Sequence, residues 1–126
     1  MELLNAQHYV HHILRIPLED WPNPVQRAFA AVNPAVYVST QGPSELGISQ
    51  DAKLAGWSRF DDLSSIEVPT LVIGAHYDTM DPAHMEKMAE QLPRGRYFYC
   101  PDGSHLAMYD DQHTYFSGLL DFLRSL

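Results

Sequence analysis

The sequence of 126 residues has little that would favour binding to nucleic acid or to a membrane. It has 8 Lys and Arg against 16 Asp and Glu, which gives a formal net charge of −8. Nucleic acids and anionic membranes attract basic patches, so this composition argues against both as partners. No apolar run approaches the roughly 18 residues that a transmembrane helix needs.

Cysteine is nearly absent as well, because Cys100 is the only one, and no disulfide can form within the chain. A chain without disulfides fits a reducing compartment. The first residues, MELLNAQHYVHH, lack the basic and apolar regions of a secretion signal, so we expect a cytoplasmic protein. What is present is a composition typical of a globular domain, 45% hydrophobic and 11% aromatic.

The histidines raise the question of a metal site. His8, His11 and His12 have the spacing that places imidazoles on one face of a helix. Zinc sites need further ligands and a supporting shell, and no Cys pair or His-Glu-x-x-His motif occurs. We therefore predict no metal site and interpret these histidines as surface or packing residues.

The first half of the sequence is predicted to be helical or irregular. A helix is expected over 3–14, and Pro24 suits the first position of a second helix that ends at Asn33-Pro34. The stretch AVYVST is too short to assign, and 41–57 contains glycine and proline that are typical of a loop.

The second half predicts a strand–helix–strand–helix order. The apolar run VPTLVIGA (68–75) is typical of a buried strand, and Asp81-Pro82 offers an N-cap and a first-turn proline for a helix over 82–92. Met85 and Met88 share the apolar spacing of that helix and are predicted to fill the core. A strand over 96–100 and an amphipathic helix over 114–126 complete a βαβα unit of an α/β fold with parallel strands.

Two parallel strands that are apolar on both faces cannot bury those faces or their open edges by themselves. The chain is therefore expected to be the C-terminal part of a larger α/β domain, or a subunit that needs a partner.

Two polar residues follow the two predicted strands. Asp78 comes after strand 68–75 and His105 comes after strand 96–100. Because functional groups collect at the carboxyl ends of parallel strands, these loops are expected to lie side by side and to bring the carboxylate to the imidazole. Such a pair acts as acid and base in Ser-His-Asp catalysis. A structural interpretation also remains open, with Asp78 in a turn or cap and His105 as a solvated turn residue.

No credible nucleophile accompanies this pair. The order acid-then-histidine matches α/β-hydrolases, whose serine lies in a G-x-S-x-G turn, and the chain has no such pentapeptide. Ser104 adjoins His105 on the same loop, and Cys100 is expected to be a buried strand residue. Asp110 and Asp111 are interpreted as first-turn acids of the last helix, and Asp102 as loop surface.

The phrases VPTLVIGAHYDTMDP, GRYFYCPDGSHLAMYDDQ, GPSELG and WPNPVQRAF together resemble the C-terminal part of proline iminopeptidases, serine peptidases of the α/β-hydrolase fold. The resemblance implies that Asp78 is the triad acid and His105 the general base. It also implies that 1–55 is the remnant of a helical cap and that 56–126 is the C-terminal part of the hydrolase core. No metal or organic cofactor is implied.

The resemblance further implies a peptide substrate with a free N-terminal proline. Glu45, in GPSEL, matches a cap glutamate that binds the substrate ammonium, whereas a loop-surface glutamate is the structural alternative. Some relatives carry a second acid directly after the triad acid, where this chain has Thr79. The front half of the family, with its nucleophile, has no counterpart, so the chain is expected to be inactive alone and to need the missing N-terminal part or to self-associate. A different α/β-hydrolase, such as an esterase or epoxide hydrolase, and a non-catalytic assembly partner remain alternatives.

Overall fold

The computed structural model describes residues 6–44 and 47–126, and these form two compact units. The first unit contains residues up to Val10 together with Ile16–Ser58. The second contains Arg59–Leu126 together with a short early segment, His11–Arg15. No sequence pattern predicted that this early segment packs with the second half of the chain.

The first unit is built from short helices. The chain is α-helical over 6–8 and continues as the π-helix η1 (Tyr9–Ile13), which confirms a helix in the described part of 3–14. It is followed by the 3₁₀ turn η2 (Leu18–Asp20) and by the helices α2 (Asn23–Ala30) and α3 (Pro34–Thr40). Tyr9, Trp21 and Phe29 form its aromatic cluster, with ring centroids 5.0 Å apart for Trp21 and Phe29 and 5.6 Å apart for Tyr9 and Phe29.

The helix boundaries differ from the prediction at Asn33. Helix α2 begins at Asn23, one residue before Pro24, and ends at Ala30. Asn33-Pro34 was predicted to end a helix, but the structure shows that it begins one. The Asn33 side chain accepts hydrogen bonds from the backbone N–H groups of Ala35 and Val36, at 3.0 and 3.3 Å, and thereby caps α3.

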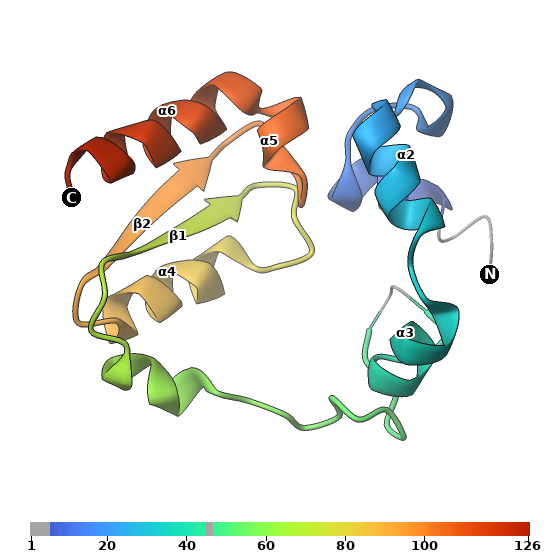
Figure 1. Ribbon diagram of the computed structural model, residues 1–126, viewed down its shortest axis with the longest axis horizontal. Helices are drawn as coiled ribbons and strands as arrows, with labels where there is room; N and C mark the ends of the chain where they lie inside the picture. Colours follow the sequence, from blue (N-terminus) through green and yellow to red (C-terminus); the bar gives the residue numbers. More distant parts are fainter. Residues whose placement is uncertain (1–5, 45–46) are drawn as a thin grey trace. The chain divides into compact units, whose positions relative to one another are not determined.

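The second unit has the predicted βαβα order (Figure 1). After the 3₁₀ helix η3 (Phe60–Ser65), strand β1 (Thr70–Ala75), helix α4 (Pro82–Gln91), strand β2 (Gly95–Cys100), the one-turn helix α5 (Ala107–Asp110) and helix α6 (Gln112–Arg124) follow in turn. The strands are parallel and pair from Thr70 with Gly95 to Ala75 with Cys100. Asp81 caps α4, since its carboxylate accepts a hydrogen bond from the backbone N–H of Ala83 at 3.0 Å.

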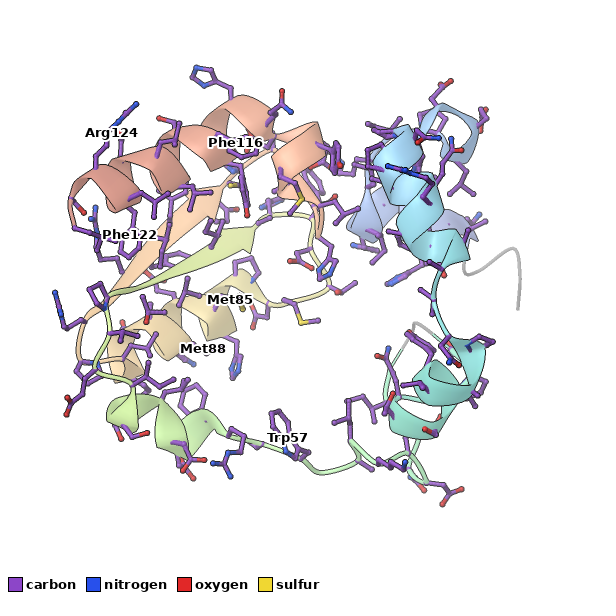
Figure 2. All side chains as sticks on the ribbon, viewed as in Figure 1. Trp57, Met85, Met88, Phe116, Phe122 and Arg124 are labelled. Carbon is purple, nitrogen blue, oxygen red and sulfur yellow. The ribbon has the colours of Figure 1, made fainter. Side chains whose placement is uncertain are left out.

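Helices α4 and α6 cover opposite faces of the sheet (Figure 1). On one face Val72 packs with Ala89 and Leu92, and the half-buried Met85 and Tyr97 join them, which confirms the predicted core role of Met85. Figure 2 shows Met85 and Met88 projecting from α4. On the other face, a Cβ added to Gly118 of α6 would meet the ring of Phe98, so glycine lets this helix approach the strand closely.

The outer part of α6 remains apolar and accessible. Figure 2 shows Arg124 on the outer side of this helix and Phe122 on the side toward the strands. Phe122 is buried, but Phe116, Leu120 and Leu123 are 40%, 44% and 51% exposed. The described residues contain a single sheet, of two strands. These features agree with the expectation that the sheet belongs to a larger domain.

Within residues 6–44 and 47–126, no helix is long and apolar enough to cross a membrane.

Candidate active site

The loops that follow β1 and β2 are held together by backbone hydrogen bonds beyond the ends of the strands. The N–H of His76 donates to the carbonyl of Cys100, and the N–H of Tyr77 donates to the carbonyl of Gly103, each at 3.0 Å. Gly103 is buried, and a Cβ at this position would lie 2.7 Å from the Cβ of Ala107 and 3.1 Å from that of Cys100. Glycine is therefore required for the loop after β2 to fold back against the end of that strand and the start of α5.

This arrangement brings Asp78 and His105 together, as their positions after the two strands predicted. Oδ1 of Asp78 lies 3.0 Å from Nδ1 of His105. The Asp78 side chain is 10% exposed, whereas the His105 side chain is 44% exposed. The pair therefore has a mostly buried carboxylate behind an accessible imidazole, as an orienting acid and a proton-transferring base require.

Three donors converge on the same oxygen of Asp78. Besides His105, the backbone N–H of Met80 donates to Oδ1 at 3.1 Å, and the hydroxyl of Thr79 donates to it at 3.3 Å. Burial raises the pKa of this carboxyl, but the hydrogen bonds from His105 and Met80 and the charge of His105 outweigh burial, so the pKa of Asp78 lies below its ordinary value of 3.8. An ionised carboxylate can only accept hydrogen bonds, so Nδ1 of His105 carries the proton. In the neutral ring, Nε2 is then the basic nitrogen.

Neither of the two nucleophilic side chains near His105, Ser104 in the same loop and Cys100 at the end of β2, can serve this imidazole. Ser104 is 1% exposed, and its hydroxyl contacts the Ile13 carbonyl at 2.9 Å and the carboxylate of Asp110. Cys100 is fully buried, and burial, with smaller contributions from the charges of Asp111 and Asp110, raises the pKa of its thiol to about 11. The prediction that Cys100 is a buried strand residue is confirmed.

The prediction that Asp110 and Asp111 are first-turn acids of the last helix is wrong. Asp110 ends α5, and its carboxylate accepts hydrogen bonds from the backbone N–H groups of Ser104 and Arg15, both at 3.0 Å. Asp111 precedes α6 without capping it, and its carboxylate accepts from the N–H of Asp102 at 3.3 Å. Both carboxylates accept hydrogen bonds from backbone N–H groups within or next to the His105 loop. The spacing of residues along a helix does not indicate such contacts. Asp102 is exposed, as predicted.

The early segment His11–Arg15 packs against both the loop of Asp78 and the loop of His105, and sequence reasoning missed it. The N–H of His105 donates to the carbonyl of His12, and the N–H of Leu106 donates to the carbonyl of Ile13, each at 2.9 Å. On the other loop, Nδ1 of His12 lies 2.8 Å from the carbonyl oxygen of Tyr77, so this nitrogen is the donor. Residues so distant in sequence carry no shared pattern that would have predicted these contacts.

Two other predictions concern Glu45 and metal binding. Glu45 lies outside the described residues. Among the residues that the structure describes, no group of three or more His, Cys, Asp or Glu side chains is arranged to hold a metal ion.

Solved structures share this fold over nearly the whole chain. VinJ superimposes with a TM-score of 0.83 at 29% sequence identity, over 94% of this chain and 40% of that protein. A proline iminopeptidase of Mycobacterium smegmatis superimposes with a TM-score of 0.85 at 24% identity, over 98% of this chain and 41% of that protein. The chain thus has the fold of the C-terminal portion of an α/β-hydrolase.

Curated sequences identify the relatives within this fold. The proline iminopeptidases of Elizabethkingia meningoseptica and Chitinophaga pinensis are 49% and 46% identical to this chain over 99% of its length. The chain is therefore a homologue of the proline iminopeptidases, and the resemblance predicted from the sequence is confirmed. It spans 41% of the length of these relatives, and no protein-family model matches it.

A weaker similarity extends to a protein of another name. A putative non-heme bromoperoxidase, BpoC, of Mycobacterium tuberculosis is 31% identical over 70 residues, which is 55% of this chain. The similarity over this part of the chain is therefore not restricted to peptidases.

Proposed function

We propose that this chain supplies the acid and the base of a serine-type aminopeptidase that releases N-terminal proline from peptides. The hydrogen bond between Asp78 and His105, placed beyond the carboxyl ends of adjacent parallel strands, carries this proposal. The homology to proline iminopeptidases supplies the substrate class.

In the proposed reaction, His105 and Asp78 have separate roles. Nε2 of His105 accepts the proton of a serine hydroxyl as that oxygen attacks the carbonyl carbon of the N-terminal proline. The imidazolium then gives this proton to the leaving amine, and an acyl-enzyme remains. In the second half of the reaction His105 takes a proton from water as it attacks the ester, and it then gives this proton to the serine oxygen as the ester bond breaks and proline leaves. Asp78 stays ionised, holds the proton on Nδ1 and stabilises the imidazolium in both halves.

The serine must come from outside these 126 residues. The sequence contains no G-x-S-x-G turn. Ser104 is buried, and its hydroxyl contacts the Ile13 carbonyl and the Asp110 carboxylate. Its source is the part of the hydrolase that corresponds to the remaining length of the relatives, and the chain alone is proposed to be inactive. That part also offers the sheet extension and the cover that the exposed face of α6 needs.

Substrate selection is assigned to the first half of the chain. Residues 1–55, apart from the segment His11–Arg15, are proposed to be the end of a cap domain, and Glu45 is proposed to pair with the free ammonium of the substrate. A carboxylate in a partly desolvated site binds an ammonium strongly and rejects a blocked chain end, because the amide then leaves the carboxylate unpaired.

A chimeric enzyme tests the proposal. These 126 residues replace the matching C-terminal part of the Elizabethkingia meningoseptica relative, and release of the amine from a proline arylamide is measured. We expect turnover that requires a free N-terminus and that is lost in His105→Ala. The matched control is His113→Ala, an exposed histidine of α6, which should turn over like the parent chimera.

A folded chimera that is inactive, or in which His105→Ala retains the parent rate, would reject the assignment. The similarity to the putative bromoperoxidase BpoC shows that relatives of this chain extend beyond peptidases. The second candidate is therefore another α/β-hydrolase, such as an esterase, in which the Asp-His pair of this chain acts on a different substrate. Equal cleavage of acetylated and free proline arylamides, or activity on simple esters alone, would favour this candidate.

A further inference from the structure

We propose that Arg15 is a positioning residue that holds the loops of Asp78 and His105 in register. This inference rests on the proposed roles of Asp78 and His105. It assigns a function to the segment His11–Arg15, which packs with the catalytic half of the chain although it belongs to the early sequence.

The guanidinium of Arg15 bridges the two loops. Its Cζ lies 3.6 Å from the centroid of the Tyr77 ring. Tyr77 directly precedes Asp78 in the chain. Its Nη1 donates a hydrogen bond at 3.0 Å to the carbonyl of Asp102, three residues before His105. One planar cation therefore stacks on the first loop and binds the second, and so it links the two loops.

The backbone of Arg15 reinforces this link. Its N–H donates to Asp110 at 3.0 Å, and the same carboxylate accepts the N–H of Ser104 at 3.0 Å. Ser104 directly precedes His105 and is buried. The carboxylate of Asp110 thus connects the backbone of Arg15 to that of Ser104, the residue next to His105.

The remaining segment contacts fix the same two loops. The carbonyls of His12 and Ile13 accept hydrogen bonds from His105 and Leu106, while Nδ1 of His12 donates to the carbonyl of Tyr77. Because the catalytic hydrogen bond spans the gap between the two loops, a small shift of either one lengthens it. Displacements of about 1 Å can cost about 10²-fold in rate.

Arginine suits this position for a physical reason. Its guanidinium is planar, stacks on aromatic rings and donates in fixed directions, whereas the ammonium of lysine is a compact, flexible charge. Arg15→Lys should therefore recover only part of the function, although it keeps the charge.

The tautomer of His105 provides a readout that does not depend on activity. The chimera is labelled with ¹⁵N-histidine, and the His105 ring signals are assigned by comparison with His105→Gln. We expect the parent chimera to hold the proton on Nδ1, and Arg15→Met to populate both tautomers, because the carboxylate no longer fixes the ring. Arg15→Lys should be intermediate. The control Arg124→Met removes a 72% exposed arginine of α6 and should leave the tautomer unchanged.

A second pair of variants covers the case in which Arg15→Met does not fold. Tyr77→Phe keeps the aromatic ring that stacks on the guanidinium and should behave like the parent. Tyr77→Leu removes this ring and should allow His105 to populate both tautomers. Unchanged Nδ1 protonation in folded Arg15→Met or in Tyr77→Leu would overturn the positioning role. If Asp78→Asn itself leaves the tautomer unchanged, the proposed catalytic pair has failed instead, so the two failures are distinguishable.

Discussion

Oδ1 of Asp78 lies 3.0 Å from Nδ1 of His105, although the two residues are 27 positions apart in the sequence. The parallel pairing of β1 with β2 produces this proximity, because it ends both strands at the same edge of the sheet. Backbone hydrogen bonds from His76 to Cys100 and from Tyr77 to Gly103 then extend the pairing up to Asp78. The relationship therefore follows from the sheet and not from local sequence.

The lowered pKa of Asp78 predicts a dependence of stability on pH. A carboxyl with a lower pKa in the folded state contributes stability above its unfolded pKa, close to 3.8, and this contribution is lost as the pH falls through the folded value. The free energy of unfolding of the parent minus that of Asp78→Asn should therefore shrink as the pH falls from about 6 to about 2. Urea denaturation measures this difference.

The control for this experiment is Asp121→Asn, which removes a carboxylate that is 67% exposed in an i,i+3 pair on α6. Such surface pairs contribute little to stability, so its difference should stay small at every pH. A difference for Asp78→Asn that is equally flat would show that the carboxylate is not stabilised in the folded state.

Gly103→Ala should destabilise the fold by about 1–3 kcal/mol, because the new methyl group overpacks a buried turn. Its neighbours, the Cβ atoms of Ala107 and Cys100, are attached directly to the backbone and cannot turn away. Gly74→Ala is the comparison, since its methyl group meets the ring of Tyr97, a side chain that can move. Urea denaturation should rank Gly103→Ala as the more destabilised, and the reverse ranking would contradict the tight packing of this loop.

Cys100 should be unreactive in the folded chain. Its thiol is fully buried and its pKa is about 11, so it is protonated and inaccessible near neutral pH. With a disulfide reagent such as DTNB, we expect slow labelling in buffer and one thiol per chain in denaturant. Fast stoichiometric labelling of the folded protein would show an accessible thiol and would reopen its assignment as a core residue.

Glu45→Gln in the chimera should raise KM for a proline arylamide, because the amide cannot form an ion pair with the substrate ammonium. The kcat should change less, since the contact is made equally in the ground state and in the transition state. Steady-state kinetics with free and acetylated substrates separate the two constants. An unchanged KM would remove Glu45 from amine recognition and leave the glutamate as a surface residue.

A serine-directed fluorophosphonate should not label the chain alone. Ser104 is buried, and its hydroxyl contacts Ile13 and Asp110 and not His105. Mass spectrometry after incubation should show the unmodified chain, whereas the active chimera should gain one probe. Covalent labelling of the isolated chain would show that it contains its own activated nucleophile.

Local patterns predicted the elements whose signals lie close together in the sequence. The β-branched run over β1, the Asp81-Pro82 start of α4 and the glycine and proline between α4 and β2 were sufficient for the βαβα order. Asn33-Pro34 was misread because asparagine and proline suit both the end of one helix and the start of the next. The hydrogen bonds at Asn33 decide between them.

The contact between Asp78 and His105 was predictable because both residues follow strands, and the parallel pairing of these strands fixes where their loops meet. The contacts of Arg15 were not predictable, since its partners Asp102 and Asp110 lie 87 and 95 positions away and belong to no periodic pattern. The role of Asp110 was predicted wrongly for the same reason. Its neighbours in the sequence suggest the start of a helix, but one of its hydrogen-bond donors, Arg15, is far away in the sequence.

The most direct test of the central claim is the turnover number of Asp78→Asn in the chimera with a proline arylamide. If Asp78 fixes the tautomer of His105, kcat should fall by about 10⁴-fold, as loss of a triad acid does, while the protein stays folded. A kcat within a few-fold of the parent value would contradict the account.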